Sequence, residues 1–78
     1  MLNLGSWLKK LYLRINDRNK LNAVKKILFE HKGNTPVYVY FNDTKTNTIA
    51  NKDMWVILSS TLIDRLKGIL GEDNVVVV

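Results

Sequence analysis

Residues 10–15 alternate strictly between polar and apolar side chains, which predicts a strand with two unlike faces. The apolar members of this segment are Leu11, Leu13 and Ile15. They would point to one side of a sheet, and Lys10, Tyr12 and Arg14 would point to the other side. These three side chains stay outside the core only if that face of the sheet is open. An open face with two basic residues and one aromatic residue is a candidate binding surface.

A second alternating segment follows Pro36, a residue that fits the first position of a strand because no ladder donor is needed there. Its apolar side chains, on one face, are Val37, Val39 and Phe41. Tyr38 and Tyr40 would lie on the opposite face. The candidate surface therefore consists of Lys10, Tyr12, Arg14, Tyr38 and Tyr40.

Two helices are predicted from the spacing of apolar residues. The first covers about residues 18–31, with an N-cap at Asn16-Asp17 and a stop at Gly33. The second starts near the capping residues Ser59 to Thr61 and ends at Gly71. Both helices carry one apolar stripe and would cover a sheet.

The remaining segments are a polar strand, an ambiguous stretch and an apolar strand. Residues 46–50 would return from a turn as the second arm of a hairpin, and their polarity predicts an edge position. Residues 51–58 are compatible with a short buried strand or with an extended lead into the second helix. Residues 75–78 are all valine, a run typical of a strand that is central or covered on both faces.

The order of these elements predicts an α+β fold with the ferredoxin-like βαββαβ arrangement. We expect a four-stranded antiparallel sheet with two helices on one face, and the first strand in the centre beside the last. The expected core consists of Leu11, Leu13, Ile15, Leu21, Val24, Leu28, Val37, Val39, Phe41, Leu62, Leu66 and Ile69.

A chain of 78 residues has room for one domain. We assign residues 10–78 to a single interaction domain and residues 1–9 to a lead-in or linker, in which Trp7 could pack on the core. The chain has no cysteine, and its longest apolar run, at residues 54–58, is too short to span a membrane. These features favour a cytoplasmic protein without a membrane partner.

The positive charge is concentrated in the first strand and helix. Residues 9–32 hold eight basic and two acidic side chains, whereas the rest of the chain holds four basic and five acidic ones. Such asymmetry favours an anionic partner through steering and counterion release. The alternative is that these lysines only keep the helix soluble.

No pattern for catalysis or cofactor binding stands out. His31 is the sole histidine and has no nucleophile or acid at catalytic spacing, so a structural role is favoured. The acidic residues fall in turns and at helix ends, where capping explains them, and no glycine-rich phosphate loop is present. We therefore expect no catalytic residue, metal, cofactor or small-molecule ligand, and the missing glycine after the first strand also argues against an amino-acid-binding regulatory domain.

The basic and aromatic face raises a nucleic-acid alternative. Leu11 to Leu13 faintly resembles the shorter strand signature of the RNA-recognition motif, in which aromatic residues on central strands stack on bases. The longer signature should fall on residues 45–50, which contain no aromatic residue. The tyrosines could also be simple strand formers with a polar tip at the water interface.

Three stretches together resemble the C-terminal domain of the bacterial DNA polymerase III alpha subunit. The first is the strand at residues 10–15, and the second runs from Leu28 through His31 and Gly33 to Pro36-Val37. The third begins at Ser60 and continues along the second helix to Asn74-Val75. Lys32 stands where the family often has proline.

This resemblance implies a non-catalytic module of a DNA-directed DNA polymerase, a nucleotidyltransferase that acts in DNA replication. Such a module lies beyond the OB domain and helps tether the polymerase to the tau subunit of the clamp loader. None of the polymerase's metal-binding aspartates would lie in this chain. Apolar residues such as Trp7 or Trp55 would anchor the partner. The alternative function is a stand-alone domain that binds single-stranded nucleic acid, with single-stranded DNA as the candidate partner, through the open sheet face.

Overall fold

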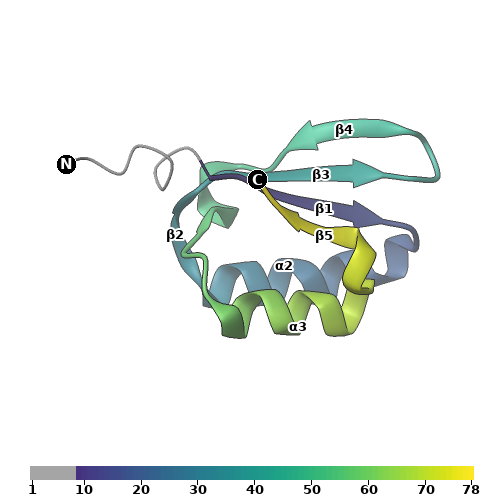
Figure 1. Cartoon of the computed structure of the whole chain (residues 1–78). Coiled ribbons are helices and arrows are strands. Elements are labelled where there is room, and N and C mark those ends of the chain that lie inside the picture. Colours follow the sequence, from purple (N-terminus) through teal and green to yellow (C-terminus); the bar gives the residue numbers. More distant parts are fainter. Residues whose placement is uncertain (1–8) are drawn as a thin grey trace.

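The computed structural model describes residues 9–78, which form a sheet with α2 and α3 side by side on one face (Figure 1). The strands are β1 (Leu11–Ile15), β2 (Lys32–Thr35), β3 (Val37–Phe41), β4 (Thr46–Ile49) and β5 (Val75–Val77). The helices are α2 (Leu21–Glu30) and α3 (Ser60–Leu70), and short 3₁₀ turns are η1 (Arg18–Lys20), η2 (Lys52–Met54) and η3 (Glu72–Asn74). The predicted lead-in with Trp7 lies outside the described residues, except for Lys9.

The α+β class and the two helices on one face are confirmed, but the purely antiparallel sheet is wrong. The four strands are ordered β4-β3-β1-β5. β1 pairs with β3 in parallel, whereas β1 with β5 and β3 with β4 are antiparallel. The first strand does lie in the centre beside the last, as expected. The hairpin strand β4 extends the sheet outward instead of lying between β1 and β3, as a split βαβ unit would require.

The polarity of β4 explains this departure. Thr46 and Thr48 are the partners of Phe41 and Val39, so they share the sheet face that the helices cover. In a central strand these hydroxyl groups would be buried, which is costly without a hydrogen-bond partner. At the edge, every residue of β4 remains exposed. The predicted edge position of this strand is thus confirmed, and it excludes the ferredoxin-like order.

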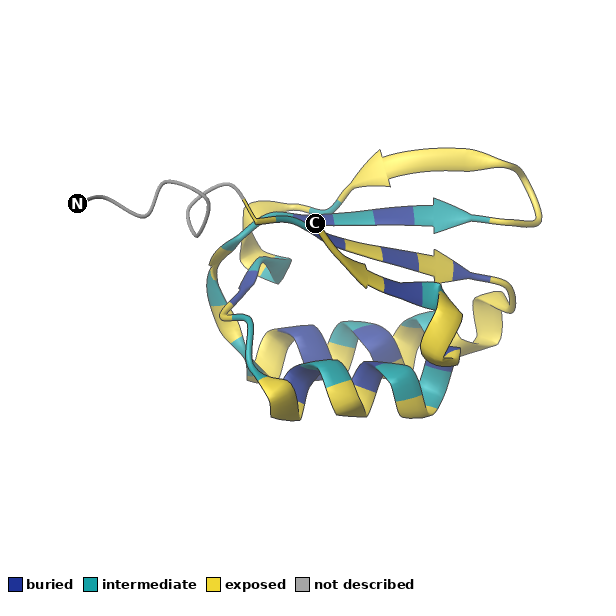
Figure 2. Cartoon of the chain, viewed as in Figure 1, coloured by how far each residue is buried: buried dark blue, intermediate teal, exposed yellow. Residues whose placement is uncertain are grey.

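The core lies between the sheet and the two helices, where the buried residues of Figure 2 face one another. The buried residues are Leu11, Leu13, Ile15, Val24, Ile27, Leu28, Val37, Val39, Val56, Leu62, Leu66, Leu70 and Val75. Most of the expected core is confirmed. Phe41 and Ile69 are only partly buried and pack against the cluster, and Leu21 is also half-buried. No buried side-chain polar atom lacks a hydrogen-bond partner within residues 9–78.

The last strand differs from its prediction, because β5 is an edge strand. Among the strands of residues 9–78 it pairs with β1 alone, and Val75 is its single buried residue. Val76, Val77 and Val78 are exposed. The valine run therefore indicated a strand correctly but not its burial, since three consecutive residues of one strand cannot all face the helices.

The predicted caps at Asp17, Ser59 and Gly71 are confirmed, but the predicted stop of the first helix at Gly33 is wrong. α2 ends at Glu30 with His31 as its C-cap, and Gly33 lies in β2. The Asp17 side chain accepts a hydrogen bond from the Asn19 backbone N–H at 2.9 Å, which opens η1 and leads into α2. Ser59 caps α3 by accepting from the Leu62 backbone N–H at 3.1 Å. Gly71 ends α3 with φ of 96°, a conformation that favours glycine.

A short strand, β2, joins α2 to the sheet and was missing from the predictions. It pairs with the ambiguous stretch at residues 51–58: the Gly33 N–H donates to the Trp55 carbonyl at 2.9 Å, and the Ile57 N–H donates to the His31 carbonyl at 2.8 Å. Val56 between them is fully buried. This stretch is thus an extended segment with one core residue, preceded by η2.

Gly33 permits this close approach, which leads to a stability prediction. A Cβ at this position would lie 2.5 Å from the Ile57 backbone nitrogen, so Gly33→Ala must push two backbone segments apart. We expect a loss of about 2 kcal/mol in the free energy of unfolding, measured by urea denaturation.

Gly68→Ala is the matched control, because a Cβ at Gly68 in α3 would meet nothing within 4 Å. It should stabilise the protein by up to about 1 kcal/mol through helix propensity. Equal stability changes for the two variants would contradict this role of Gly33.

Candidate binding surface

The open face of the sheet brings together the five residues predicted as a candidate surface. β1 carries Tyr12 and Arg14 away from the helices, since their neighbours Leu11, Leu13 and Ile15 are buried beneath. The parallel register places Tyr12 opposite Tyr38 and Arg14 opposite Tyr40. Lys10 precedes β1 on the same face. Their placement follows the prediction, whereas their role in binding stays a prediction.

Tyr12 and Tyr38 form a stacked pair across the β1–β3 contact. Their ring centroids are 5.0 Å apart and the rings are 15° from parallel. The Lys10 ammonium lies 5.7 Å from the Tyr38 centroid, within the range of a cation–π contact. Two aromatic rings and a cation thus form a continuous cluster near the start of both strands.

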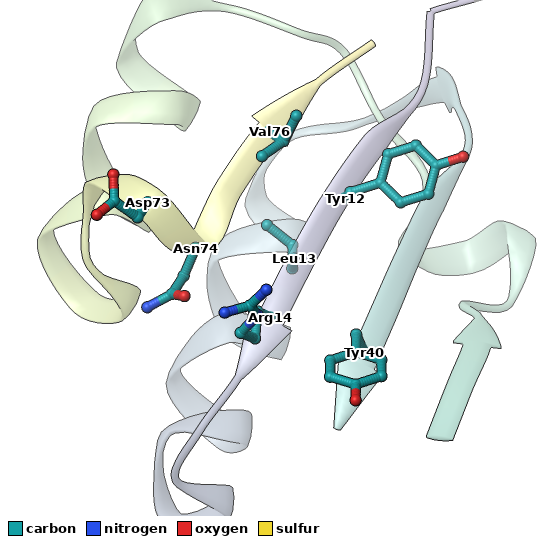
Figure 3. Close-up of a pocket in the computed structure, with 7 residues that line it drawn as sticks. All are labelled: Tyr12, Leu13, Arg14, Tyr40, Asp73, Asn74 and Val76. Carbon is teal, nitrogen blue, oxygen red and sulfur yellow. The ribbon is translucent and has the colours of Figure 1, made fainter. Parts of the chain in front are cut away.

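Near the other end of these strands, the Arg14 guanidinium carbon lies 6.0 Å from the centroid of the Tyr40 ring. A hollow of about 230 Å³ opens beside this pair (Figure 3). Its lining residues are Tyr12, Leu13, Arg14, Tyr40, Asp73, Asn74 and Val76. Asn74 is held by a hydrogen bond from its Nδ2 to the Leu70 carbonyl, so η3 forms a fixed wall. The hollow is large enough for one side chain of a ligand.

The outer strands β4 and β5 also place side chains on the open face, which the pattern of residues 10–15 and 37–41 did not indicate. Ile49 pairs with Tyr38, and Val76 pairs with Tyr12, so both side chains lie on the open face. Together, Ile49, Tyr38, Tyr12 and Val76 form an apolar row that crosses all four strands. The alternation of side chains along β4 and β5 could assign Ile49 and Val76 to this row only once the strand order was known.

Trp55, predicted as a possible anchor for a partner, is half-buried. Its indole Nε1 donates to the Ala50 carbonyl at 3.0 Å, and the ring packs against the core cluster. The ammonium of Lys52, the first residue of η2, lies 5.8 Å from the ring centroid. These contacts favour a structural role for Trp55, and Trp7 lies outside the described residues.

His31 lies at the C-terminal end of α2 among charged neighbours on the helix layer. The Arg65 Nη1 atom is 2.7 Å from a carboxylate oxygen of Glu30 and 3.2 Å from His31 Nε2. This cluster is exposed and belongs to the helix layer, whereas the open-face residues lie on the strands. Among residues 9–78, no three histidine, cysteine or acidic side chains lie close enough to hold a metal ion.

By fold and surface, residues 9–78 are a small two-layer α+β domain with one open sheet face that is basic and aromatic. Neither α2 nor α3 is long and apolar enough to cross a membrane.

The chain is 38% identical over 56 residues to the DNA polymerase III alpha subunit of Bacillus subtilis, an alignment that covers 72% of the chain. It is 31% identical over 74 residues to the same subunit of Halalkalibacterium halodurans, covering 88% of the chain. The chain corresponds to only 5% and 7% of the lengths of these relatives. No family model and no solved structure matches it. The chain is thus related to a domain of the DNA polymerase III alpha subunit, as its sequence resemblance indicated.

The ion pair between Glu30 and Arg65 makes a prediction about protonation. The hydrogen bond from Arg65 lowers the pKa of the Glu30 carboxyl below its ordinary value, and the positive charge of Arg65 adds to this effect. Arg65→Gln should therefore raise the Glu30 pKa, measured by an NMR titration of the carboxyl carbon. Arg18→Gln is the control, because Arg18 pairs instead with Asp43.

The sign of the stability effect follows from this pKa. Because the folded-state pKa is lowered, the pair stabilises the fold above the ordinary pKa of glutamate and loses this effect as the pH falls through the folded-state value. An unchanged Glu30 pKa in Arg65→Gln would contradict the assignment.

Proposed function

We propose that this chain is a non-catalytic interaction module of the DNA polymerase III alpha subunit, one that tethers the polymerase to the tau subunit of the clamp loader. The sequence resemblance to the C-terminal domain of that subunit carries the proposal. The aligned regions cover 72% and 88% of the chain, so most of the chain, rather than a single motif, has a counterpart in the relatives.

The surface is suited to holding a protein. An open sheet face that combines exposed apolar side chains with aromatic and basic ones has the composition of a protein interface, in which aromatic residues and arginine are enriched. The two helices are already packed against the other face of the sheet, and α2 and α3 contact each other. The open face is therefore the side on which a further layer can be added.

The proposal predicts direct binding to tau. The full chain, immobilised and titrated with a C-terminal fragment of tau, should bind in a manner that persists at moderate salt, because apolar contacts are less sensitive to salt than charge contacts. Surface plasmon resonance gives the affinity and its salt dependence. No detectable interaction at any salt concentration tested would refute the tether.

A second candidate function is binding of single-stranded nucleic acid, which is favoured by the presence of cations and tyrosines on the same open face. Bases stack on aromatic side chains without sequence preference, and nearby cations neutralise phosphates. The concentration of positive charge at residues 9–32 would add to the attraction.

This second function predicts a steep dependence on salt. If Lys10 and Arg14 each neutralise one phosphate, a plot of the logarithm of the affinity for oligo-dT against the logarithm of the salt concentration should have a slope of about −1.4. Tyr12→Ala should cost roughly 1–3 kcal/mol of binding free energy. Fluorescence anisotropy with labelled oligo-dT measures both, and a flat salt titration would remove nucleic acid as a ligand.

A further inference from the structure

We infer that the open sheet face is a docking site for an amphipathic α-helix of a protein partner, whose apolar stripe is bordered by acidic residues. The inference rests on the proposed function as an interaction module and adds which surface binds and what chemistry it recognises. It is carried by the register of the four strands, the exposure of the apolar row and the placement of charge beside that row.

The apolar row is exposed along its length. Ile49 is 50% exposed, Tyr12 is 38% exposed and Val76 is 48% exposed, and Tyr38 between them is half-buried. The pairings of Ile49 with Tyr38, Tyr38 with Tyr12, and Tyr12 with Val76 make the row continuous. Scattered exposed apolar residues need no explanation, but a continuous row across a sheet indicates an interaction site.

The dimensions of the row suit a helix. Four strands are separated by three spacings, so the row is about 14 Å long and perpendicular to the strands. A helix of about ten residues has this length and presents apolar side chains at every third or fourth position along one stripe. The hollow lined by Tyr40 and Val76 lies at one end of the row and can accept one of these side chains (Figure 3).

The charges lie where the flanks of such a helix would be. Lys10 and Arg14 are two residues before and two residues after Tyr12, so their Cα atoms are about 13 Å apart along β1. This distance is close to the diameter of a helix with its side chains, about 10–12 Å. A helix on the row would thus have one cation on each side.

Both cations remain available to a ligand. Within the described part of the chain, the ion pairs join Arg18 to Asp43 and Arg65 to Glu30, and neither Lys10 nor Arg14 takes part in one. Asp73 is the acidic side chain that lines the hollow beside Arg14. A partner residue that enters the hollow should therefore be apolar, and carboxylates should lie further along the flanks.

The same geometry is less suited to nucleic acid. Base stacking needs free ring faces, but Tyr38 stacks on Tyr12 and also has the Lys10 ammonium near its ring, while Tyr40 has the Arg14 guanidinium. The outer strands add Ile49 and Val76 to the face, which offer a phosphate backbone nothing to bind. A ligand with apolar side chains and flanking carboxylates would contact both the apolar row and the two cations.

The test uses the full 78-residue chain, labelled with nitrogen-15, and a helix-forming peptide with leucine at positions i, i+3, i+7 and i+10 and glutamate on both flanks. The backbone amide signals of β1, β3, β4 and β5 should shift on titration, and those of α2 and α3 should not. A peptide with lysine in place of each glutamate should bind at least tenfold more weakly.

The charge-reversal variant Lys10→Glu/Arg14→Glu should bind the acidic peptide at least about tenfold more weakly than the wild-type chain, because attraction on both flanks becomes repulsion. The matched control, Lys20→Glu/Lys26→Glu, makes the same change in net charge on exposed residues of η1 and α2 and should keep the affinity. Unshifted signals of α3, in which neither variant carries a substitution, verify that the fold is intact.

Several outcomes would overturn the inference: equal binding of the acidic and basic peptides, no binding, or shifts confined to the helices. Tighter binding of oligo-dT to the same amides would assign the face to nucleic acid instead. A parallel titration with the tau fragment separates the two proposals. If tau binds the wild-type and the charge-reversed chains equally, the docking site is wrong and the tether to tau stands. If tau does not bind the wild-type chain but the acidic peptide does, the tether to tau is wrong and the docking site stands.

Discussion

The pairing of β1 with a strand on each side is the interaction on which the rest of the structure depends. β1 is bonded in parallel to β3 and antiparallel to β5, and this position buries Leu11, Leu13 and Ile15 against both helices. The backbone bonds continue past the strand, from the Asn42 N–H to the Ile15 carbonyl and between Lys10 and Val78. Because side chains alternate along a strand, the same pairing fixes Tyr12 and Arg14 on the opposite face.

The surface proposed for partner binding is a consequence of this arrangement rather than a separate addition. The parallel register aligns Tyr12 with Tyr38 and Arg14 with Tyr40, so the two tyrosines of β3 lie beside these residues of β1 on the open face. A shift by one residue would move every one of these side chains to the core face and expose the leucines. Burial of Leu11 and Leu13 therefore maintains the open face, and stability and binding depend on the same register.

A two-layer domain of this kind is well suited to a role within a larger subunit. One face of the sheet is covered by helices of the same chain, and the other can be covered by a partner without rearrangement of the core. The relatives are far longer than this chain, which matches 5–7% of their length. These relatives are named as polymerase subunits, and the contribution proposed for this domain is attachment.

The sequence was sufficient to predict which residues share a face and two of the strand pairings, β1 with β5 and β3 with β4. It did not predict the parallel pairing of β1 with β3. Alternation at Leu11 to Ile15 and at Val37 to Phe41 reports burial directly, and Asp17 and Ser59 mark helix starts through local hydrogen bonds. Strand order depends instead on contacts between distant segments. The threonines of β4 held the relevant signal, because their polarity on the helix side excludes a central position.

Two other features could not be read from local pattern for similar reasons. β2 contains Gly33 and Asn34, which are typical of a turn, and it becomes a strand only because Val56 is buried beside it. The apolar row could not be assembled without the strand order, since Ile49 and Val76 come from opposite edges of the sheet. Both cases show that the missing information was tertiary pairing rather than residue preference.

The strand order is the claim that supports both the fold and the surface, and a nuclear Overhauser spectrum of the full chain tests it most directly. Parallel pairing of β1 with β3 predicts cross-peaks between backbone protons of β1 and β3, together with contacts between the Tyr12 and Tyr38 rings. Cross-peaks that connect the backbone of β1 to Thr46–Ile49 instead would place the hairpin strand in the centre. That result would contradict the account.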